Sequence, residues 1–422
     1  MSVEGAVHRG PTSLAEEVRL RGTFSHWHNL LYEIWWLTGP LEVNAVRDAW
    51  RRVCLRHDAM RRTYASPVEA LTHRDPVAEV ELHTADTDDE AAAIMRRSLG
   101  TPFDLGGDRF TRIVLVQRDD QRHLLGISVD HVISDEMSWQ YLMQDFNVQY
   151  RQALERTAPD TAESRTYRDF ASAMREDFDG AWGSERREFW TGYTRDFGNI
   201  PPSFSLQGES KAEPDMTTLA LDLPADGTAM VCASASQARA TPFSVIASAM
   251  LSSMQEVSGE DAAGLLFHHH GRFTPGCYGT LGLFTQGVPV HLRGTSPSRL
   301  DTVRDVFHRS VQTSDHILSL DIAGDTWSRS LISPRASEVF LGVTEGRNAS
   351  TNVRLPGITA ESVEMKFDGA AAGKDTIVFV WTLRESHPHV TATYNRNLFP
   401  DESVDRLLRL AAAHAVEPLE QA

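Results

Sequence analysis

Cysteine is scarce in this chain. Its 422 residues include only Cys54, Cys232 and Cys277, which lie far apart in the sequence. This spacing fits neither a disulfide framework nor a zinc site, and it predicts a protein of the reducing cytoplasm. No apolar run reaches the roughly 18 residues that a membrane span needs. The N-terminus lacks a basic segment followed by an apolar one, so we expect no membrane insertion and no signal peptide.

Positive charge is also in deficit. Lysine and arginine number 41 against 58 acidic residues, which gives a formal net charge of −17. An acidic surface argues against nucleic acid as the main partner, because phosphate binding needs basic residues gathered on one face. Local basic patches remain possible at three arginine pairs, although paired arginines on helices are more often simply solvated. These pairs are residues 61–62, 96–97 and 186–187.

The apolar content of 41% is ample for a sizeable core over this length. Helix and strand signals alternate, which predicts a mixed α/β chain. The expected helices cover residues 43–53, 139–146, 243–254 and 404–411, and the expected strands cover 113–116, 124–129, 265–267, 288–290, 376–383 and 390–394. The polar stretch 154–187 predicts a domain boundary, and residues 204–216 and 320–336 predict exposed loops.

One stretch carries a chemical signal. The apolar run 124–129 is followed by His131 and, four positions later, by Asp135, where a helical pattern begins. A strand that ends just before a histidine fixes the imidazole, and the turn exposes it, which suits a general base. Asp135 and Glu136 would also lie in the first helical turn, where negative charge is favoured. Helix capping is therefore the competing interpretation of these two carboxylates.

Five segments, in this order, resemble the motifs of condensation domains from nonribosomal peptide synthesis. Residues 56–64 resemble RHExLRTxF, 101–105 resemble PFDL, 130–136 resemble HHxxxDG, 167–171 resemble YxDFA, and 281–286 resemble IGxFVN. Each motif alone is weakly specific, but their order over almost the whole chain makes the resemblance strong. The resemblance implies an α/β fold of two chloramphenicol-acetyltransferase-like subdomains in a V-shaped pseudo-dimer. The first, residues 1–175, carries the DHxxxDE motif; the second covers 176–422. The active site would lie in a tunnel between them.

The resemblance also implies roles for individual residues. His131 matches the second histidine of the motif and is the expected catalytic base; an unperturbed imidazole titrates near about 6.5, close to cellular pH. Asp135 matches the aspartate, whose implied role is structural, in a salt bridge with the arginine matched by Arg61. Losing one partner of such a buried pair costs about 3–5 kcal/mol.

Two motif positions depart from the family pattern. Asp130 replaces the first histidine, which shapes the loop in the family, so we expect Asp130 to support the loop. Glu136 replaces the glycine, and it adds a side chain and a negative charge where backbone could approach closely. Three outcomes stay open: Glu136 points away along the helix, it narrows the tunnel and selects a basic or small substrate, or ordinary condensation has been lost.

Other segments are similar to the epimerisation branch of the same superfamily. They are Ser138-Trp139, residues 57–61, residues 270–272 and the pair 284–285. That branch has a glutamate where this chain has His268. The second proton carrier is then unaccounted for, although a histidine could take its place. Epimerisation therefore ranks below condensation.

The run His268 to His270 raises the question of a metal. On a strand, alternate side chains point to opposite faces, so at most two of these rings converge, and no Cys, Asp or Glu partner is apparent. We therefore expect no metal, with His268 and His270 lining the tunnel opposite His131. Gln286 stands in place of a family asparagine at the tunnel floor and is expected to hydrogen-bond substrate. The remaining tunnel-lining candidates are Glu136, Ser138 and Trp139.

The resemblance implies a free-standing condensation enzyme of natural-product (antibiotic) biosynthesis. It would transfer an acyl or aminoacyl group from a carrier-protein thioester to an amine or hydroxyl acceptor. We expect no intrinsic cofactor: the phosphopantetheine arm would come with an acyl or peptidyl carrier protein in trans, docked through a basic patch. The competing hypothesis is a catalytically degenerate module that recruits partners to a carrier-bound substrate.

Overall fold

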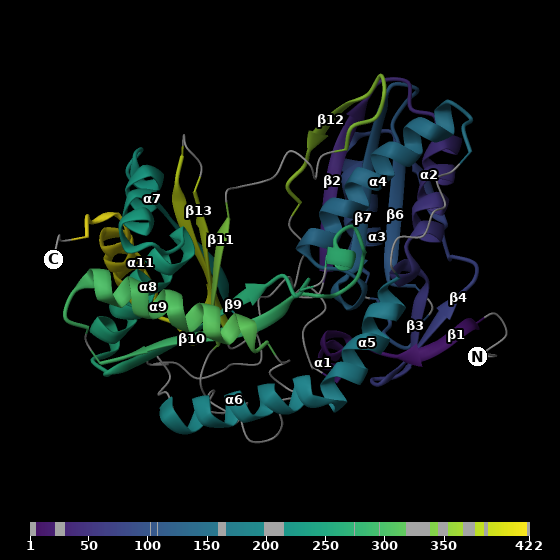
Figure 1. Cartoon of the computed structure of the whole chain (residues 1–422). Coiled ribbons are helices and arrows are strands. Elements are labelled where there is room, and N and C mark those ends of the chain that lie inside the picture. The colour runs from purple at the N-terminus through teal and green to yellow at the C-terminus, as the bar shows by residue number, and fades with distance from the viewer. Residues whose placement is uncertain are drawn as a thin grey trace. The chain divides into compact units, whose positions relative to one another are not determined.

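The computed structural model describes most of the chain, as two compact units (Figure 1). The described residues are 6–21, 30–101, 103–107, 109–158, 166–197, 215–273, 275–294, 296–317, 338–344, 353–365, 376–383 and 387–419. Unit 1 comprises Met1–Gly180, His270–Thr285 and Asn348–Ala370, and unit 2 comprises Ala181–His269, Gln286–Arg347 and Ala371–Ala422. None of the helices in these described ranges has the length and apolar character of a membrane span.

Unit 1 is built on a five-stranded sheet of order β12-β2-β7-β6-β5, beside a smaller sheet of order β1-β4-β3. The strands are β1 (Ala6–Pro11), β2 (Leu30–Thr38), β3 (Arg62–Ser66), β4 (Glu69–His73), β5 (Val80–Thr84), β6 (Thr111–Gln117), β7 (Arg122–Asp130) and β12 (Thr359–Ser362). The helices are α1 (Leu14–Arg21), α2 (Val43–Arg56), η2 (Asp58–Arg61), α3 (Asp88–Gly100), η3 (His131–Ile133), α4 (Glu136–Leu154), α5 (Tyr167–Asp179) and η4 (Pro275–Cys277).

The central strand β7 is buried on both faces because helices cover both sides of the sheet. Leu125, Ile127 and Val129 face a core shared with α2 and α4. Leu124 faces the opposite core, shared with α3. Gly126 lets α3 approach closely, since a Cβ there would lie 2.3 Å from Met95 Sδ. This double cover fixes the strand from which the candidate site begins.

Unit 2 is built on a six-stranded sheet of order β10-β9-β11-β13-β14-β8. Its strands are β8 (Met216–Asp222), β9 (Ala262–His269), β10 (Gln286–Arg293), β11 (Glu338–Thr344), β13 (Thr376–Thr382) and β14 (His389–Asn395). Its helices are α6 (Ala181–Phe197), α7 (Gly227–Ala238), α8 (Pro242–Ser258), α9 (Arg299–Asp315) and α11 (Asp401–Val416).

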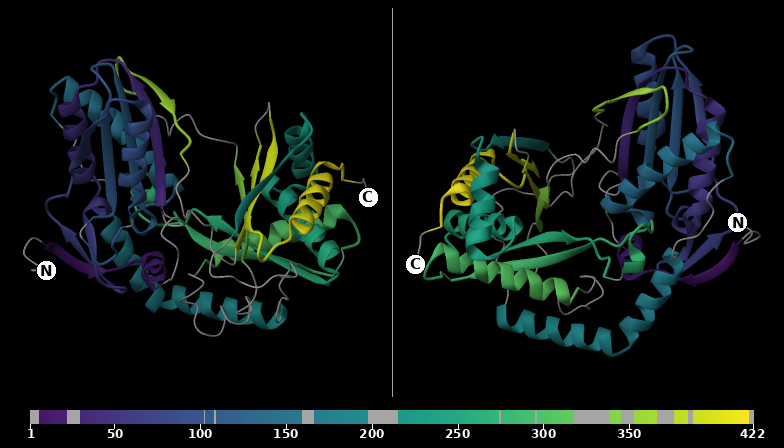
Figure 2. Two further views of the ribbon diagram at one scale, coloured as in Figure 1. Left: turned by 180° about the vertical axis from the view of Figure 1, so that it is seen from behind. Right: turned by 45° about the horizontal axis from the view of Figure 1, so that its top comes forward.

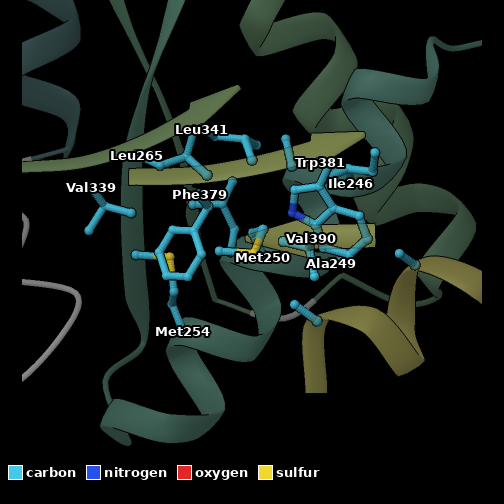
Figure 3. Close-up of a cluster of buried hydrophobic side chains, with 14 of the residues drawn as sticks. Ile246, Ala249, Met250, Met254, Leu265, Val339, Leu341, Phe379, Trp381 and Val390 are labelled. Atoms are coloured by element: carbon cyan, nitrogen blue, oxygen red, sulfur yellow. The ribbon is translucent and has the colours of Figure 1, made fainter. Parts of the chain in front are cut away.

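Helices α7, α8, α9 and α11 form one apolar core with this sheet (Figure 2). Figure 3 shows Ile246, Met250 and Met254 of α8 against Phe379 and Trp381 of β13. The helix α8 begins where the sequence predicts, because the Thr241 side chain accepts a hydrogen bond from Ser244 N and Pro242 occupies the first turn.

The expected local elements are confirmed. Residues 43–53 lie in α2, residues 139–146 lie in α4, and β6 and β7 pair as an antiparallel hairpin. The expected strands of the second half appear as β9, β10, β13 and β14, and residues 404–411 lie in α11. The polar stretch 154–187 contains α5 and the start of α6. The loop expected at 320–336 lies outside the described residues, as does 204–216 except for residues 215–216, where β8 begins.

The division between the units falls at Gly180, near the boundary expected at 175/176. The division expected from the sequence assigns all of residues 176–422 to the second subdomain. The contacts instead assign residues 270–285 and 348–370 to unit 1. The first segment carries Arg272, which pairs with Asp135, and the second carries β12, which extends the sheet at β2.

A buried histidine in unit 2 makes stability depend on pH. His291 of β10 is 1% exposed, and its Nδ1 lies 2.5 Å from the Tyr193 hydroxyl. Burial, with the charges of Arg309 and Arg293, lowers the pKa of His291 to about 3. The ring is therefore neutral in the folded protein at any pH above that value, whereas in the unfolded chain it becomes protonated below about 6.5.

Replacing His291 by asparagine keeps a hydrogen-bond acceptor for Tyr193 but removes the titration. As pH falls from about 7.5 to 5, the unfolded wild type gains a proton at His291 that the folded state does not, so wild type loses about 2 kcal/mol that His291→Asn retains. Denaturant unfolding of both proteins at the two pH values measures this difference. An equal loss in both would mean that His291 is protonated in the folded state.

Candidate active site

His131 lies where β7 ends. The strand is paired with β2 on one side and β6 on the other up to its last residues. The Asp130 N–H still donates to Phe110 O at 2.9 Å, and His131 then opens the short helix η3. The ring is half-buried. His131 therefore lies at a strand end followed by a turn, as the sequence predicts.

The hydrogen bond of His131 Nδ1 selects the ring tautomer. Nδ1 lies 3.0 Å from Ser134 O. A carbonyl oxygen can only accept, so Nδ1 carries the proton of this bond. In the neutral imidazole the lone pair is then on Nε2, which is the form that a general base requires.

Asp130 supports the turn with both carboxylate oxygens. Oδ1 accepts from Val132 N at 2.8 Å, and Oδ2 accepts from Arg19 Nη2 at 3.0 Å. The side chains of Asp130 and Arg19 are 1% and 9% exposed. Burial raises the pKa of Asp130, and the Arg19 charge together with the Val132 N–H opposes that shift. Asp130 therefore acts within the loop as a capping and ion-pairing group.

Asp135 is both a helix cap and a buried ion-pair partner. Its Oδ1 accepts from Ser138 N at 2.8 Å and so caps α4. Arg272 donates to Oδ2 at 2.8 Å and to Oδ1 at 3.1 Å, and both side chains are 0% exposed. The N–H groups of Phe284 and Thr285 also donate to Oδ2, at 3.0 and 3.2 Å. The capping interpretation of Asp135 is thus confirmed, and the same carboxylate also forms a buried salt bridge.

The expected pairing of Asp135 with Arg61 is wrong. Arg61 ends η2 and donates to the backbone carbonyls of Cys54, Leu55 and His73 at 3.1, 3.2 and 2.6 Å. Those carbonyls end α2 and β4, so Arg61 holds these elements together. Arg272, distant in sequence, takes the carboxylate because residues 270–285 return to unit 1.

Ser138 and Trp139 are buried side chains with structural partners. Ser138 Oγ donates to Gly282 O at 2.7 Å and accepts from Arg272 Nη2 at 2.7 Å. Trp139 is 3% exposed and packs in the core shared with α2. Arg272 also lies 4.0 Å over the Phe284 ring. Ser138 thus joins α4 to the segment 270–285.

Two glycines allow that segment to pack this closely. Gly271 has a φ of +65°, and a Cβ there would lie 1.9 Å from Phe284 O. Gly282 has a φ of +155°, and a Cβ there would lie 2.0 Å from the Tyr167 ring. L-residues rarely adopt such φ values, and neither position has room for a side chain. Both glycines of the segments 270–272 and 281–286 are therefore required by geometry.

Glu136 is the first residue of α4 and is exposed. Partial desolvation raises the pKa of its carboxyl above the ordinary value, and the neighbouring Asp135 charge adds to this shift. A glycine at this position would present no side chain, so Glu136 adds a carboxylate to the helix N-terminus beside the His131 turn.

The remaining predicted residues divide between the units. In unit 1, His270 Nδ1 accepts from Arg272 N at 3.0 Å. In unit 2, the His268 ring lies against Phe340, with centroids 5.1 Å apart, and desolvation lowers the pKa of His268. Gln286 is 6% exposed, and among the described residues its Oε1 has no hydrogen-bond partner. Within those same residues no cluster of three or more His, Cys, Asp or Glu could hold a metal ion.

A family model named "Condensation domain" matches residues 25–319, more than half of the chain. The chain belongs to the condensation-domain family. The resemblance based on the five ordered motifs is thereby confirmed, as is the link to nonribosomal peptide synthesis.

Curated relatives of the domain are much longer proteins. The polyketide synthase-nonribosomal peptide synthetase phmA of Phaeosphaeria nodorum is 22% identical over 88% of this chain and 9% of phmA. Bacitracin synthase 1 of Bacillus licheniformis is 22% identical over 59% of this chain and 5% of that protein. The chain spans less than a tenth of the length of these relatives.

Solved structures match the condensation domain over nearly its full length. The X-domain in its complex with OxyB from teicoplanin biosynthesis has a TM-score of 0.82 at 19% identity and covers 98% of this chain and 94% of that chain. SgcC5 from Streptomyces globisporus has a TM-score of 0.71 at 17% identity, with 97% and 100% covered. These similarities confirm the expected α/β condensation-domain fold. The V-shaped arrangement and the tunnel between the halves stay predictions.

Several buried polar residues that support the site are not predicted by the sequence. Asp58 is buried and accepts from Tyr167 N at 2.8 Å and from Arg168 N at 3.0 Å, which joins two of the five motifs. Arg62, considered above as part of a basic patch, is 3% exposed and pairs with the buried Glu16. Neither contact has a local signal in the sequence, because each joins segments that are distant in sequence.

A double-mutant cycle distinguishes Arg272 from Arg61 as the partner of Asp135. We expect Arg272→Met to lower the free energy of unfolding by about 3–5 kcal/mol, because it leaves the Asp135 charge buried without a cation. Asp135→Asn combined with Arg272→Met should recover part of that loss. The matched cycle of Asp135→Asn with Arg61→Met should be additive within about 0.5 kcal/mol. Denaturant unfolding of the variants checks both cycles, and coupling to Arg61 instead would contradict the pairing.

Proposed function

We propose that this condensation domain transfers an acyl or aminoacyl group from a carrier-protein thioester to an amine or hydroxyl, with His131 as the base. The observation that carries the proposal is the hydrogen bond from His131 Nδ1 to Ser134 O. It holds the neutral ring with its lone pair on Nε2, on a turn fixed by Asp130 and Asp135. Family membership supports the reaction class.

The proposed reaction needs one proton carrier and no redox step. The nucleophilic nitrogen or oxygen attacks the thioester carbonyl as its proton passes to His131 Nε2. The new C–N or C–O bond forms, the C–S bond breaks, and the proton on Nε2 is delivered to the departing thiolate. The products are an amide or ester and a free pantetheine thiol on the carrier.

The donor would arrive on the phosphopantetheine arm of an acyl or peptidyl carrier protein. Such an arm carries amide groups, which can donate hydrogen bonds to buried acceptors. The buried Oε1 of Gln286 is an acceptor without a partner among the described residues, which is unfavourable unless a ligand or water supplies a donor. We propose Gln286 as a substrate contact on this ground. Arg96 and Arg97 on α3 are exposed and are the pair we propose for carrier docking.

Acyl transfer from carrier-bound thioesters to amine and alcohol acceptors tests the proposal. We expect product from wild type and a loss of at least about 100-fold in kcat for His131→Ala, because a positioned general base contributes roughly that factor. Mass spectrometry of the product identifies amide or ester and detects any inverted stereocentre, which would instead indicate epimerisation. His8→Ala, which changes an exposed histidine of β1 in unit 1 that has no predicted site role, is the matched control and should retain activity within a few-fold.

A second candidate function is a non-catalytic module that recruits enzymes to a carrier-bound substrate. The exposed carboxylate of Glu136, at the motif position of a glycine, favours it. The solved X-domain that this chain is similar to is in complex with OxyB. Wild type that binds a loaded carrier by calorimetry yet gives no product with any acceptor would support this candidate and contradict the first.

A further inference from the structure

Helix α1 is short but carries an unusual share of buried charge. The side chains of Glu16 and Arg19 are 0% and 9% exposed, and both have partners outside the helix. Charged side chains are almost never buried without a partner. Their partners lie on two sides of the turn that carries His131.

The first partner is Asp130. Arg19 Nη2 donates to Asp130 Oδ2 at 3.0 Å, and the other oxygen of the same carboxylate accepts from Val132 N at 2.8 Å. The Arg19 guanidinium thus fixes the carboxylate that caps the turn immediately beside His131.

The second route runs through Glu16. This carboxylate accepts from Arg62 Nε and Nη2, both at 2.9 Å, and from the Tyr64 hydroxyl at 2.8 Å. The Tyr64 hydroxyl also lies 3.2 Å from Val132 O. The single hydroxyl proton of Tyr64 is shared between Glu16 Oε1, the nearer acceptor, and Val132 O. Val132, the residue after His131, is therefore held at its N–H by Asp130 and contacted at its carbonyl by Tyr64. Burial and the Glu16 charge raise the pKa of Tyr64 well above its ordinary value, so the hydroxyl stays a donor.

We propose that Arg19 and Tyr64 are positioning residues for His131. Through them, α1 fixes the backbone of Val132, the residue that follows the base: Arg19 orients Asp130, and Glu16 orients Tyr64. This proposal rests on the proposed function only for its kinetic consequence. The structural part stands on contacts within unit 1, because α1, β3 and the His131 turn all belong to that unit.

Amide hydrogen exchange of the full chain tests the proposal without any activity. Val132 N–H donates to Asp130, and Ser134 N–H donates to His131 O at 3.2 Å, so these amides report the turn. In Arg19→Met and in Tyr64→Phe we expect their exchange to accelerate at least tenfold, with protection of the β6 amides unchanged. Arg21→Met is the matched control on the same helix. Among the described residues Arg21 pairs with Glu17, four positions away, and its side chain is 59% exposed, so exchange should not change.

Kinetics of the same variants provide the second readout. A displaced base should lower kcat at least tenfold with KM within about twofold, since misplacement by about 1 Å alone can cost about 100-fold. Adding Asp130→Asn to Arg19→Met removes the unpaired charge and should restore the folded yield but not kcat. Unchanged exchange at Val132 and Ser134 in both single variants overturns the proposal. Accelerated exchange together with an inactive wild type would uphold the positioning and reject the acyl-transfer function.

Discussion

The candidate site depends on one buried carboxylate. Asp135 accepts two hydrogen bonds from Arg272 and one each from the N–H groups of Ser138, Phe284 and Thr285. A bare carboxylate in this 0% exposed position would be very costly, so every donor around it is needed. The same carboxylate caps α4, and its bonds to Arg272, Phe284 and Thr285 join the segment 270–285 to the rest of unit 1. The turn that presents His131 is therefore closed by charge pairing and glycine geometry rather than by apolar packing alone.

Three buried ion pairs surround that turn, and each joins segments distant in sequence. They are Arg19 with Asp130, Arg62 with Glu16, and Arg272 with Asp135. Buried pairs add little net stability, because desolvation offsets their attraction, but removing one partner is strongly destabilising. We infer that their role here is to specify one geometry for the turn. The replacement of a motif histidine by Asp130 fits this scheme, because a carboxylate can both cap Val132 N and neutralise Arg19.

Local patterns in the sequence predicted the strand-turn-helix unit around His131 correctly. The apolar run of β7, the cap at Asp135 and the periodic face of α4 are all encoded within a few residues, so propensity and patterning suffice. The prediction of Arg61 as the partner of Asp135 is wrong. Motif order indicates which residues matter, but it does not indicate which arginine reaches a given carboxylate. Arg61 satisfies nearby carbonyls, and Arg272 reaches Asp135 only because Gly271 and Gly282 permit close packing. The buried state of Glu16 and Arg62 had no local signal at all.

We propose that the turn holds His131 ready to accept a proton at Nε2. Nitrogen-15 NMR of the imidazole, assigned by comparison with a His131→Gln variant, reads the tautomer directly at a pH where the ring is neutral. The account predicts a protonated Nδ1, bonded to Ser134 O, and an unprotonated Nε2. A neutral ring with the proton on Nε2 would contradict it, because the nitrogen proposed as the base would then have no lone pair to use.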